Sequence, residues 1–121
     1  MKRILTSLTV AAAMFANSAS AFDPDDLQKL LTTKECRECD LGDANLYGAI
    51  LEGANLYHAN MKGASMFGAY LQGSNLESSD LEGADLSAAN LESADLKFTY
   101  MNGVTFCNTI MLDGSVIYSG C

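Results

Sequence analysis

The chain has few of the residues that most catalytic mechanisms need. It has a single histidine, His58, and contains neither an H-E-x-x-H zinc motif nor a glycine-rich phosphate loop. A Ser-His-Asp triad or a Cys-His pair would have to use His58, and no pattern around it arranges a nucleophile beside it. We therefore expect no catalytic residue, no cofactor site and no metal site, and we predict that the chain is not an enzyme.

Basic residues are also scarce. Lys and Arg number 7 against 15 Asp and Glu, so the formal net charge is −8. Proteins that bind phosphate backbones or anionic lipid surfaces need clustered Lys and Arg. The composition therefore argues against nucleic acid and against a membrane surface as direct partners.

No apolar run is long enough to cross a bilayer, which takes about 20 residues. The longest, Ile4 to Phe15, follows the basic start Met1-Lys2-Arg3 and precedes the small residues Ala19-Ser20-Ala21. This order is typical of a secretory signal peptide over residues 1–21, cleaved after Ala21. We expect an exported product of residues 22–121 with formal charge −10 and no membrane anchor. Its compartment is the periplasm, or a thylakoid lumen if the source is photosynthetic.

A repeat of five residues runs without insertion over residues 39–118, which makes sixteen units. The third place of each unit holds Leu, Met, Phe or Val, and the first place is mostly Ala or another small residue. A spacing of five fits neither the 3.6 of a helix nor the 2 of a strand, so each unit must turn a corner and aim its third residue at a common axis. A core filled in this way leaves no room for a substrate pocket.

Units such as Ala84-Asp85-Leu86 and Ala89-Asn90-Leu91 have the form A-[DN]-L-x-x, which resembles the pentapeptide-repeat family. The resemblance implies an all-β fold, a right-handed four-sided parallel β-helix with about 20 residues per coil and thus about four coils. Some members of that family mimic duplex DNA and bind gyrase, and the acidity of this chain keeps that function open as an alternative.

Both ends of the repeat carry signs of a cap. In segment 22–38, Asp23 and Pro24 predict a short helix whose Leu27, Leu30 and Leu31 lie over the first coil. Bulkier first-place residues near the other end predict a last coil distorted into a cap. The tail 119–121 follows, tethered by a disulfide.

The four cysteines lie in two groups, one at each end of the repeat. In an exported chain an even number of cysteines suggests disulfides. Cys39 and Cys107 are separated by about 16 Å along the coil axis, beyond the reach of a disulfide, so the plausible pairs are Cys36–Cys39 and Cys107–Cys121. Cys36 and Cys39 also form a C-x-x-C motif, so a thiol-redox or metal-binding module remains an alternative function.

The period of about 20 residues aligns side chains outside the coils. It places Tyr47 under Phe67 and, around the adjoining corner, Ile50 under Tyr70. Four large apolar groups on one edge predict a surface for a protein partner or for a homodimer, although stacked rings can also simply pack on each other. The preferred hypothesis is a non-enzymatic exported scaffold that mediates protein–protein interaction.

Overall fold

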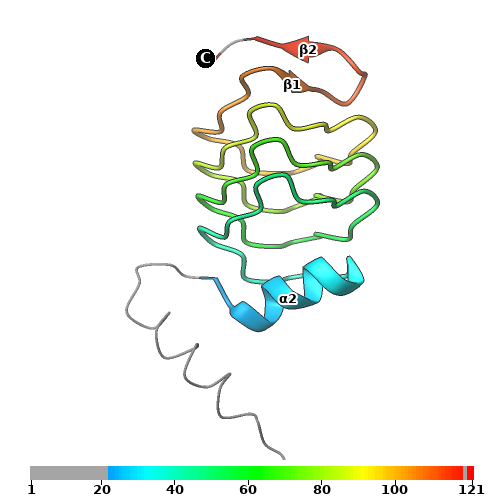
Figure 1. Cartoon of the computed structure of the whole chain (residues 1–121), viewed down its shortest axis with the longest axis vertical. Coiled ribbons are helices and arrows are strands. Elements are labelled where there is room, and N and C mark those ends of the chain that lie inside the picture. Colours follow the sequence, from blue (N-terminus) through cyan, green and yellow to red (C-terminus); the bar gives the residue numbers. More distant parts are fainter. Residues whose placement is uncertain (1–21, 119) are drawn as a thin grey trace, which may run out of the picture.

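The structure, a computed structural model, describes residues 22–118 and 120–121, so the predicted signal peptide lies outside the described residues. The described chain is a rod with helix α2 at one end, a stack of coils in the middle, and strands β1 and β2 at the other end (Figure 1). In this part of the chain no helix is long and apolar enough to cross a membrane.

Each coil pairs in parallel with the coil that follows it. The bridges join residues 20 apart, from Glu35 with Asn55 to Asn90 with Ile110. Backbone hydrogen bonds connect the layers, as where the Leu51 N–H donates to the Tyr70 carbonyl at 2.7 Å. The pairing confirms the predicted parallel β-helix of about four coils.

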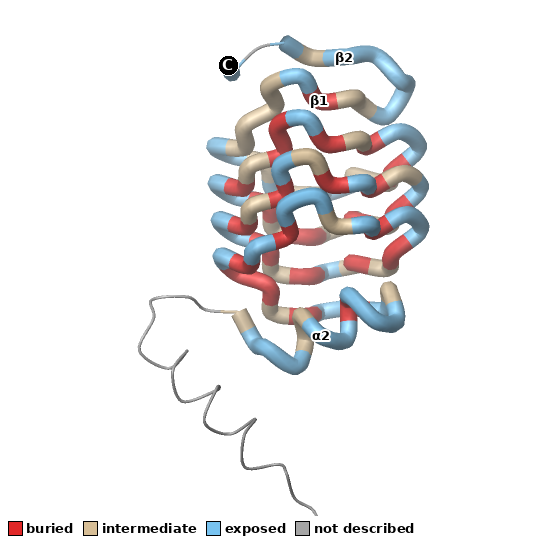
Figure 2. Tube along the Cα trace, in the orientation of Figure 1, coloured by how far each residue is buried: buried red, intermediate tan, exposed pale blue. Residues whose placement is uncertain are grey.

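The third-place side chains fill the axis of the coils. Those of the first three coils are buried except Leu96, which is partly buried, and the small first-place residues beside them are mostly buried too (Figure 2). The fully buried third-place residues are Leu41, Leu46, Leu51, Leu56, Met61, Met66, Leu71, Leu76, Leu81, Leu86 and Leu91. Burial of each such side chain contributes about 1.5–3 kcal/mol to folding, so this column is the main source of stability.

The second place of the unit, commonly Asn or Asp, sets the corner that follows it. The side-chain oxygen of Asn45 accepts the N–H of Tyr47 at 3.1 Å, and that of Asp85 accepts the N–H of Ser87 at 2.9 Å. Such a bond closes an Asx-turn, which bends the backbone two residues on. The [DN] position of the repeat is therefore a structural requirement of the corner.

Glycine is common at the corner itself because the backbone there is left-handed. Gly48 and Gly68 have φ of 64° and 69°, and a Cβ added to either would meet no atom within 4 Å. Backbone conformation, and not lack of space, therefore favours glycine at these two corners.

Helix α2, Pro24–Thr33, covers the first coil. Asp23 caps its start by accepting the Asp25 N–H at 2.8 Å. Leu30 is fully buried and Leu27 packs partly against the core, but Leu31 is 45% exposed. The expectation that all three leucines cover the coil is therefore wrong for Leu31. Asp26 accepts the Asp40 N–H at 2.8 Å, and this bond holds α2 with the face that carries Leu30 against the first coil.

At the other end the chain reverses direction. Strand β1, Thr109–Ile110, pairs antiparallel with β2, Val116–Ile117, in the register Thr109 with Ile117 and Ile110 with Val116. The count of five places Val116 in the core of a sixteenth parallel unit, yet it is 41% exposed. The parallel bridges run from Glu35 to Ile110, so they start earlier and end earlier than the predicted range 39–118. The distorted end predicted from the sequence is this hairpin.

Candidate partner surface

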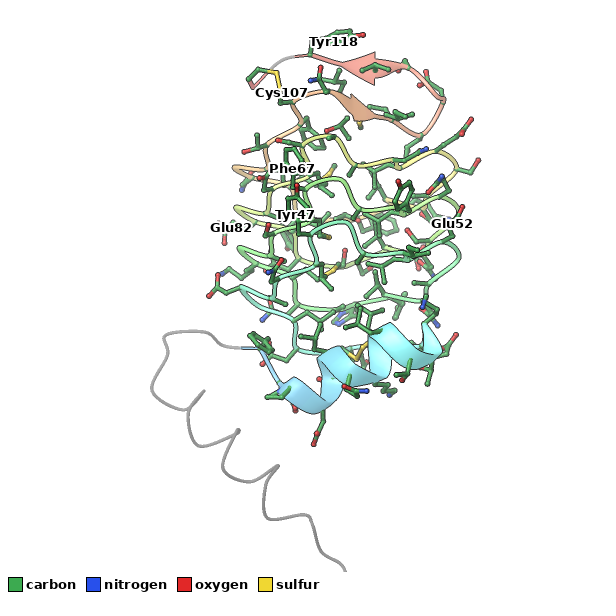
Figure 3. All side chains as sticks on the ribbon, in the orientation of Figure 1. Tyr47, Glu52, Phe67, Glu82, Cys107 and Tyr118 are labelled. Carbon is green, nitrogen blue, oxygen red and sulfur yellow. A yellow bond between two sulfur atoms is a disulfide. The ribbon has the colours of Figure 1, made fainter. Side chains whose placement is uncertain are left out.

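Four apolar side chains gather on the outside of the first two coils. The rings of Tyr47 and Phe67 stack with centroids 5.2 Å apart and planes 12° apart, and Ile50 pairs in parallel with Tyr70. Figure 3 shows Tyr47 and Phe67 in line along the axis of the rod. Tyr47, Ile50, Phe67 and Tyr70 are 68%, 62%, 39% and 49% exposed. We call these four residues the apolar edge.

Two of these residues depart from the rule that sets the corners. Ile50 and Tyr70 occupy the second place of their units, where Asn or Asp in nine other units accepts the N–H two residues on. An apolar side chain cannot make that bond, which contributes about 0.5–1.5 kcal/mol to stability. Both side chains are also exposed, so they add little to the core. A local departure that the fold does not need is typical of a functional surface.

The charges around the apolar edge are all negative. The edge lies where two sides of the rod meet, which we call the Leu46 side and the Leu51 side. The Leu46 side comprises residues 44–48, 64–68, 84–88 and 104–108, and the Leu51 side comprises residues 49–53, 69–73, 89–93 and 109–113. Together they contain Glu52, Asp85, Glu92 and Asp113 and no Lys or Arg. Glu52, Asp85 and Glu92 lie within about one coil of the apolar edge and give it an acidic border, while Asp113 lies farther off, in the turn between β1 and β2.

The basic residues of the coils lie on the other two sides, mostly opposite an acid or a ring. Lys62 pairs with Glu82 at 3.0 Å and Lys97 with Glu77 at 3.6 Å, while the Arg37 guanidinium lies 4.9 Å from the centre of the Tyr57 ring. The hydrogen bond from Lys62 to Glu82, together with the charge of that carboxylate, raises the pKa of the Lys62 ammonium above its usual 10.5. These sides are thus partly neutralised, unlike the border of the apolar edge.

The cysteines form two disulfides, one near each end of the rod. Cys36 and Cys39 are bonded, with Cα atoms 5.2 Å apart, and they are 0% and 3% exposed. Cys107 is bonded to the exposed Cys121, with Cα atoms 4.9 Å apart. Among the residues described, no group of three or more His, Cys, Asp or Glu is placed to hold a metal ion. The C-x-x-C disulfide is buried beneath α2, and this burial favours a structural role for it.

A shallow hollow of about 260 Å³ opens on the outside of the rod. Its lining comprises Asp80, Glu82, Tyr100 and Asn102, and Glu82 is already paired with Lys62. Sequence reasoning gave no role to Tyr100, nor to Phe98 and Tyr118, which are 67%, 81% and 71% exposed near the C-terminal end. Their signal in the sequence is a large ring where other units place a small or polar residue.

A family model for pentapeptide repeats matches eight copies of the repeat over residues 35–73 and 69–108. No curated protein matches the chain.

Several solved structures are similar. HetL, a pentapeptide repeat protein involved in heterocyst differentiation regulation in Nostoc sp. strain PCC 7120, is 35% identical over 64% of this chain and 43% of its own, with a TM-score of 0.44. A pentapeptide repeat protein of the Arabidopsis thaliana thylakoid lumen is 31% identical over 72% of this chain and 68% of its own, with a TM-score of 0.46. The chain thus spans less than half the length of HetL. With its repeats matched over most of the coils, the chain belongs to the pentapeptide repeat family, and its coils form the right-handed quadrilateral β-helix of that family.

Proposed function

We propose that this protein is an exported, non-enzymatic scaffold that binds another protein through the apolar edge. One observation carries the proposal. Tyr47, Ile50, Phe67 and Tyr70 form an exposed apolar surface, and two of them take the place of a corner-forming Asn or Asp. Contiguous exposed apolar groups with a polar border are typical of protein interfaces.

The border of the edge indicates the chemistry of the partner. The Leu46 and Leu51 sides contain four acidic and no basic residues, so a partner with Lys and Arg around an apolar recess is complementary to them. A second copy docked through the same edge would bring these acids toward one another, which is unfavourable. We therefore expect a basic partner protein at this surface.

The interior supports a role without catalysis. Fully buried third-place side chains fill the axis from Leu41 to Leu91, and His58 lies exposed at a corner with φ of 60° beside the ring of Tyr57. Pockets that bind substrates have volumes of several hundred cubic ångströms and need several convergent polar groups. The filled axis provides neither.

Export agrees with the cysteines. Two disulfides persist in an oxidising compartment, and the sequence of residues 1–21 has the order of a secretory signal. We propose a periplasmic or lumenal location, with cleavage after Ala21.

The test begins with chemical cross-linking in the native compartment, followed by binding measurements with the purified partner. The variant Phe67→Ser with Tyr70→Ser is expected to weaken binding at least about 100-fold, since aromatic side chains in interface centres commonly contribute 2 kcal/mol or more each. Glu52→Lys with Glu92→Lys is also expected to weaken binding. The loss of affinity is expected to be larger at low salt than at high salt, because salt screens the interaction between charges. The control is Tyr118→Ser, which removes an exposed ring at the C-terminal end. Unchanged affinity in the Phe67/Tyr70 variant, with an unchanged melting temperature, would overturn the proposal.

The C-x-x-C alternative has its own measurement. Thiol titration of the folded protein with mass mapping is expected to find Cys36 and Cys39 inert, because both are buried beneath α2. A labile Cys36–Cys39 bond, or stoichiometric zinc on the reduced protein, would instead favour a thiol-redox or metal-binding module.

A further inference from the structure

Asn102 and Gly103 form the only Asn-Gly pair in the sequence. In such a pair the backbone nitrogen of glycine can attack the side-chain carbonyl carbon of asparagine, because glycine has no Cβ to obstruct the approach. The reaction is slow where hydrogen bonds hold the glycine nitrogen, since the backbone must first open locally. The fate of this pair therefore depends on the hydrogen bonds at its corner.

Two hydrogen bonds hold the equivalent corner one coil earlier. The side-chain oxygen of Asp80 accepts the Glu82 N–H at 3.0 Å, and the Gly83 N–H donates to the Asn102 carbonyl of the next coil at 2.9 Å. The first bond closes the Asx-turn of the second place, and the second bond joins one coil to the next. Together they restrain the peptide groups before and after Glu82.

Both of these bonds are missing at Asn102. Tyr100 occupies the second place of this unit, and no further coil follows here, because β2 adds a layer only on the Leu51 side (Figure 1). Among the described residues, the N–H groups of Asn102 and Gly103 donate to no acceptor, and the side-chain amide of Asn102 makes no hydrogen bond. Asn102 and Gly103 are also both exposed. The attacking nitrogen and the group it attacks are therefore both free.

We propose that Asn102 is a site of spontaneous covalent modification. The Gly103 nitrogen loses its proton to a solvent base and bonds to Cγ of Asn102, the bond from Cγ to the side-chain nitrogen breaks, and that nitrogen leaves as ammonia with a proton from water. Water then opens the resulting succinimide ring at either of its carbonyl carbons. Opening at Cγ gives aspartate, and opening at the backbone carbonyl carbon gives isoaspartate, in which the main chain runs through the side chain. Water is the only co-reactant, and nothing is oxidised or reduced.

The modification changes the charge of the hollow that Asn102 lines with Asp80, Glu82 and Tyr100. Either product places a third carboxylate there and adds one negative charge to the −10 of the described part. Lys62 is the only basic residue on this side of the rod, which lies opposite the Leu51 side, and it is already paired with Glu82 at 3.0 Å. The new carboxylate therefore stays without a neutralising partner on this side.

Isoaspartate also changes the backbone. The Asn102 carbonyl, which accepts the Gly83 N–H at 2.9 Å, becomes part of a free carboxylate, and an additional carbon enters the main chain. The isoaspartyl product is therefore expected to loosen the contact between the last two coils at this corner, whereas the aspartyl product keeps the main chain as it was. The apolar edge lies on the first two coils, so the modification does not depend on the function proposed for that edge.

The only Asp-Gly pair in the sequence allows a comparison within the same molecule. Asp113 and Gly114 can form the same ring, but the Gly114 N–H donates to the Met111 carbonyl at 2.9 Å. The Asp113 carboxylate accepts the hydroxyl and the N–H of Ser115 at 2.6 and 2.9 Å. Both reacting groups are held, so we expect isoaspartate at Asn102 before it forms at Asp113.

Peptide mapping of the folded, purified protein during incubation at mildly alkaline pH tests the proposal. Electron-transfer fragmentation distinguishes aspartate from isoaspartate in the mapped peptides. Conversion is expected at Asn102 before any other asparagine, and native isoelectric focusing is expected to show a more acidic species that accumulates at the same rate. Asn102→Gln is expected to keep the parent melting temperature and to prevent the acidic species, because glutamine would have to close a larger and less favourable ring.

Gln72→Asn is the matched control. It creates an Asn-Gly pair at a corner that also lacks the Asx-turn, since Tyr70 occupies the second place, but the Gly73 N–H donates to the Glu92 carbonyl at 3.0 Å. In the folded protein this pair is expected to react at least about tenfold more slowly than the pair at Asn102. In concentrated urea, where neither nitrogen is held, the two pairs are expected to react at similar rates.

Equal rates at the two pairs in the folded protein would overturn the proposal, because the free Gly103 nitrogen would then not determine where the chain reacts. An Asn102 side chain that stays intact in the folded protein would also overturn it. The Phe67→Ser with Tyr70→Ser variant is expected to convert Asn102 at the rate of the parent. Failure of this proposal and failure of the apolar edge are therefore distinguished.

Discussion

At the scale of residues, each place of the five-residue unit has its own physical requirement. The third place needs bulk because it fills the axis, the first needs a small side chain beside it, and the second needs an acceptor for the corner. Ile50, Tyr70 and Tyr100 occupy the second place but cannot accept the corner N–H, and all three are exposed, so they do not fill the axis either. Comparison with the requirement of each place thus separates residues that serve the fold from those available for function.

Ser74 provides a test of the first-place requirement. Its side chain is 1% exposed, and its hydroxyl has no partner among the described residues. A buried polar group without a hydrogen bond costs about 1–3 kcal/mol, so Ser74→Ala is expected to raise the free energy of unfolding by about 1 kcal/mol. Urea denaturation measures the change.

Ser79 is the matched control, because it occupies the same place in the next unit and its hydroxyl donates to the Leu76 carbonyl at 2.7 Å. Ser79→Ala removes a satisfied hydrogen bond and is expected to lower the free energy of unfolding or leave it unchanged. An equal gain in both variants would show that alanine is simply preferred at the first place, whatever the state of the hydroxyl.

At the scale of elements, the two ends differ in how far the sequence predicted them. Asp23 and Pro24 predict the start of α2, but the spacing of Leu27, Leu30 and Leu31 cannot show which of these leucines face the coil. That choice depends on the bond from the Asp40 N–H to Asp26, a contact between segments. At the other end the pair Asp113-Gly114 is a turn signal. The five-residue spacing continues in the sequence as far as Val116, and it therefore favours a further parallel unit over a turn at this point.

The turn of the hairpin has a measurable dependence on pH. The Ser115 hydroxyl and N–H donate to the Asp113 carboxylate at 2.6 and 2.9 Å. These bonds, the hydroxyl bond above all, lower the pKa of Asp113 below its ordinary 3.8. The folded pKa is the lower one, so the contribution to stability is present above pH 3.8 and is lost as the pH falls through the folded value.

Carbon-detected NMR titration of the Asp113 carboxyl is expected to show this lowered pKa, and Ser115→Ala is expected to move it back toward 3.8. The amides of β2 should exchange faster in the acid range where Asp113 becomes protonated. If Ser115→Ala leaves the titration of Asp113 unchanged, the hydroxyl is not the cause of the shift.

At the scale of the whole molecule, periodicity predicted the architecture because every buried position repeats. The same period placed Tyr47 under Phe67 and Ile50 beside Tyr70, since stacking follows from the length of one coil. The unequal charge of the four sides was missed, because neighbours in the sequence lie on different sides of the rod.

The acidic charge of the whole rod leads to a last prediction. With 15 acidic and 5 basic residues in the described part, the folded state repels itself more than the extended chain does. Salt that screens this repulsion is expected to raise the melting temperature between 20 and 300 mM NaCl by about 5 °C, which corresponds to about 1 kcal/mol for a domain of this size. Asp85→Asn tests the cause, because Asn keeps the acceptor for the Ser87 N–H while it removes a charge from a side without Lys or Arg. This variant is expected to melt higher than the parent at low salt and to gain less from added salt. An unchanged salt response would mean that the sodium chloride acts through hydration and not through screening.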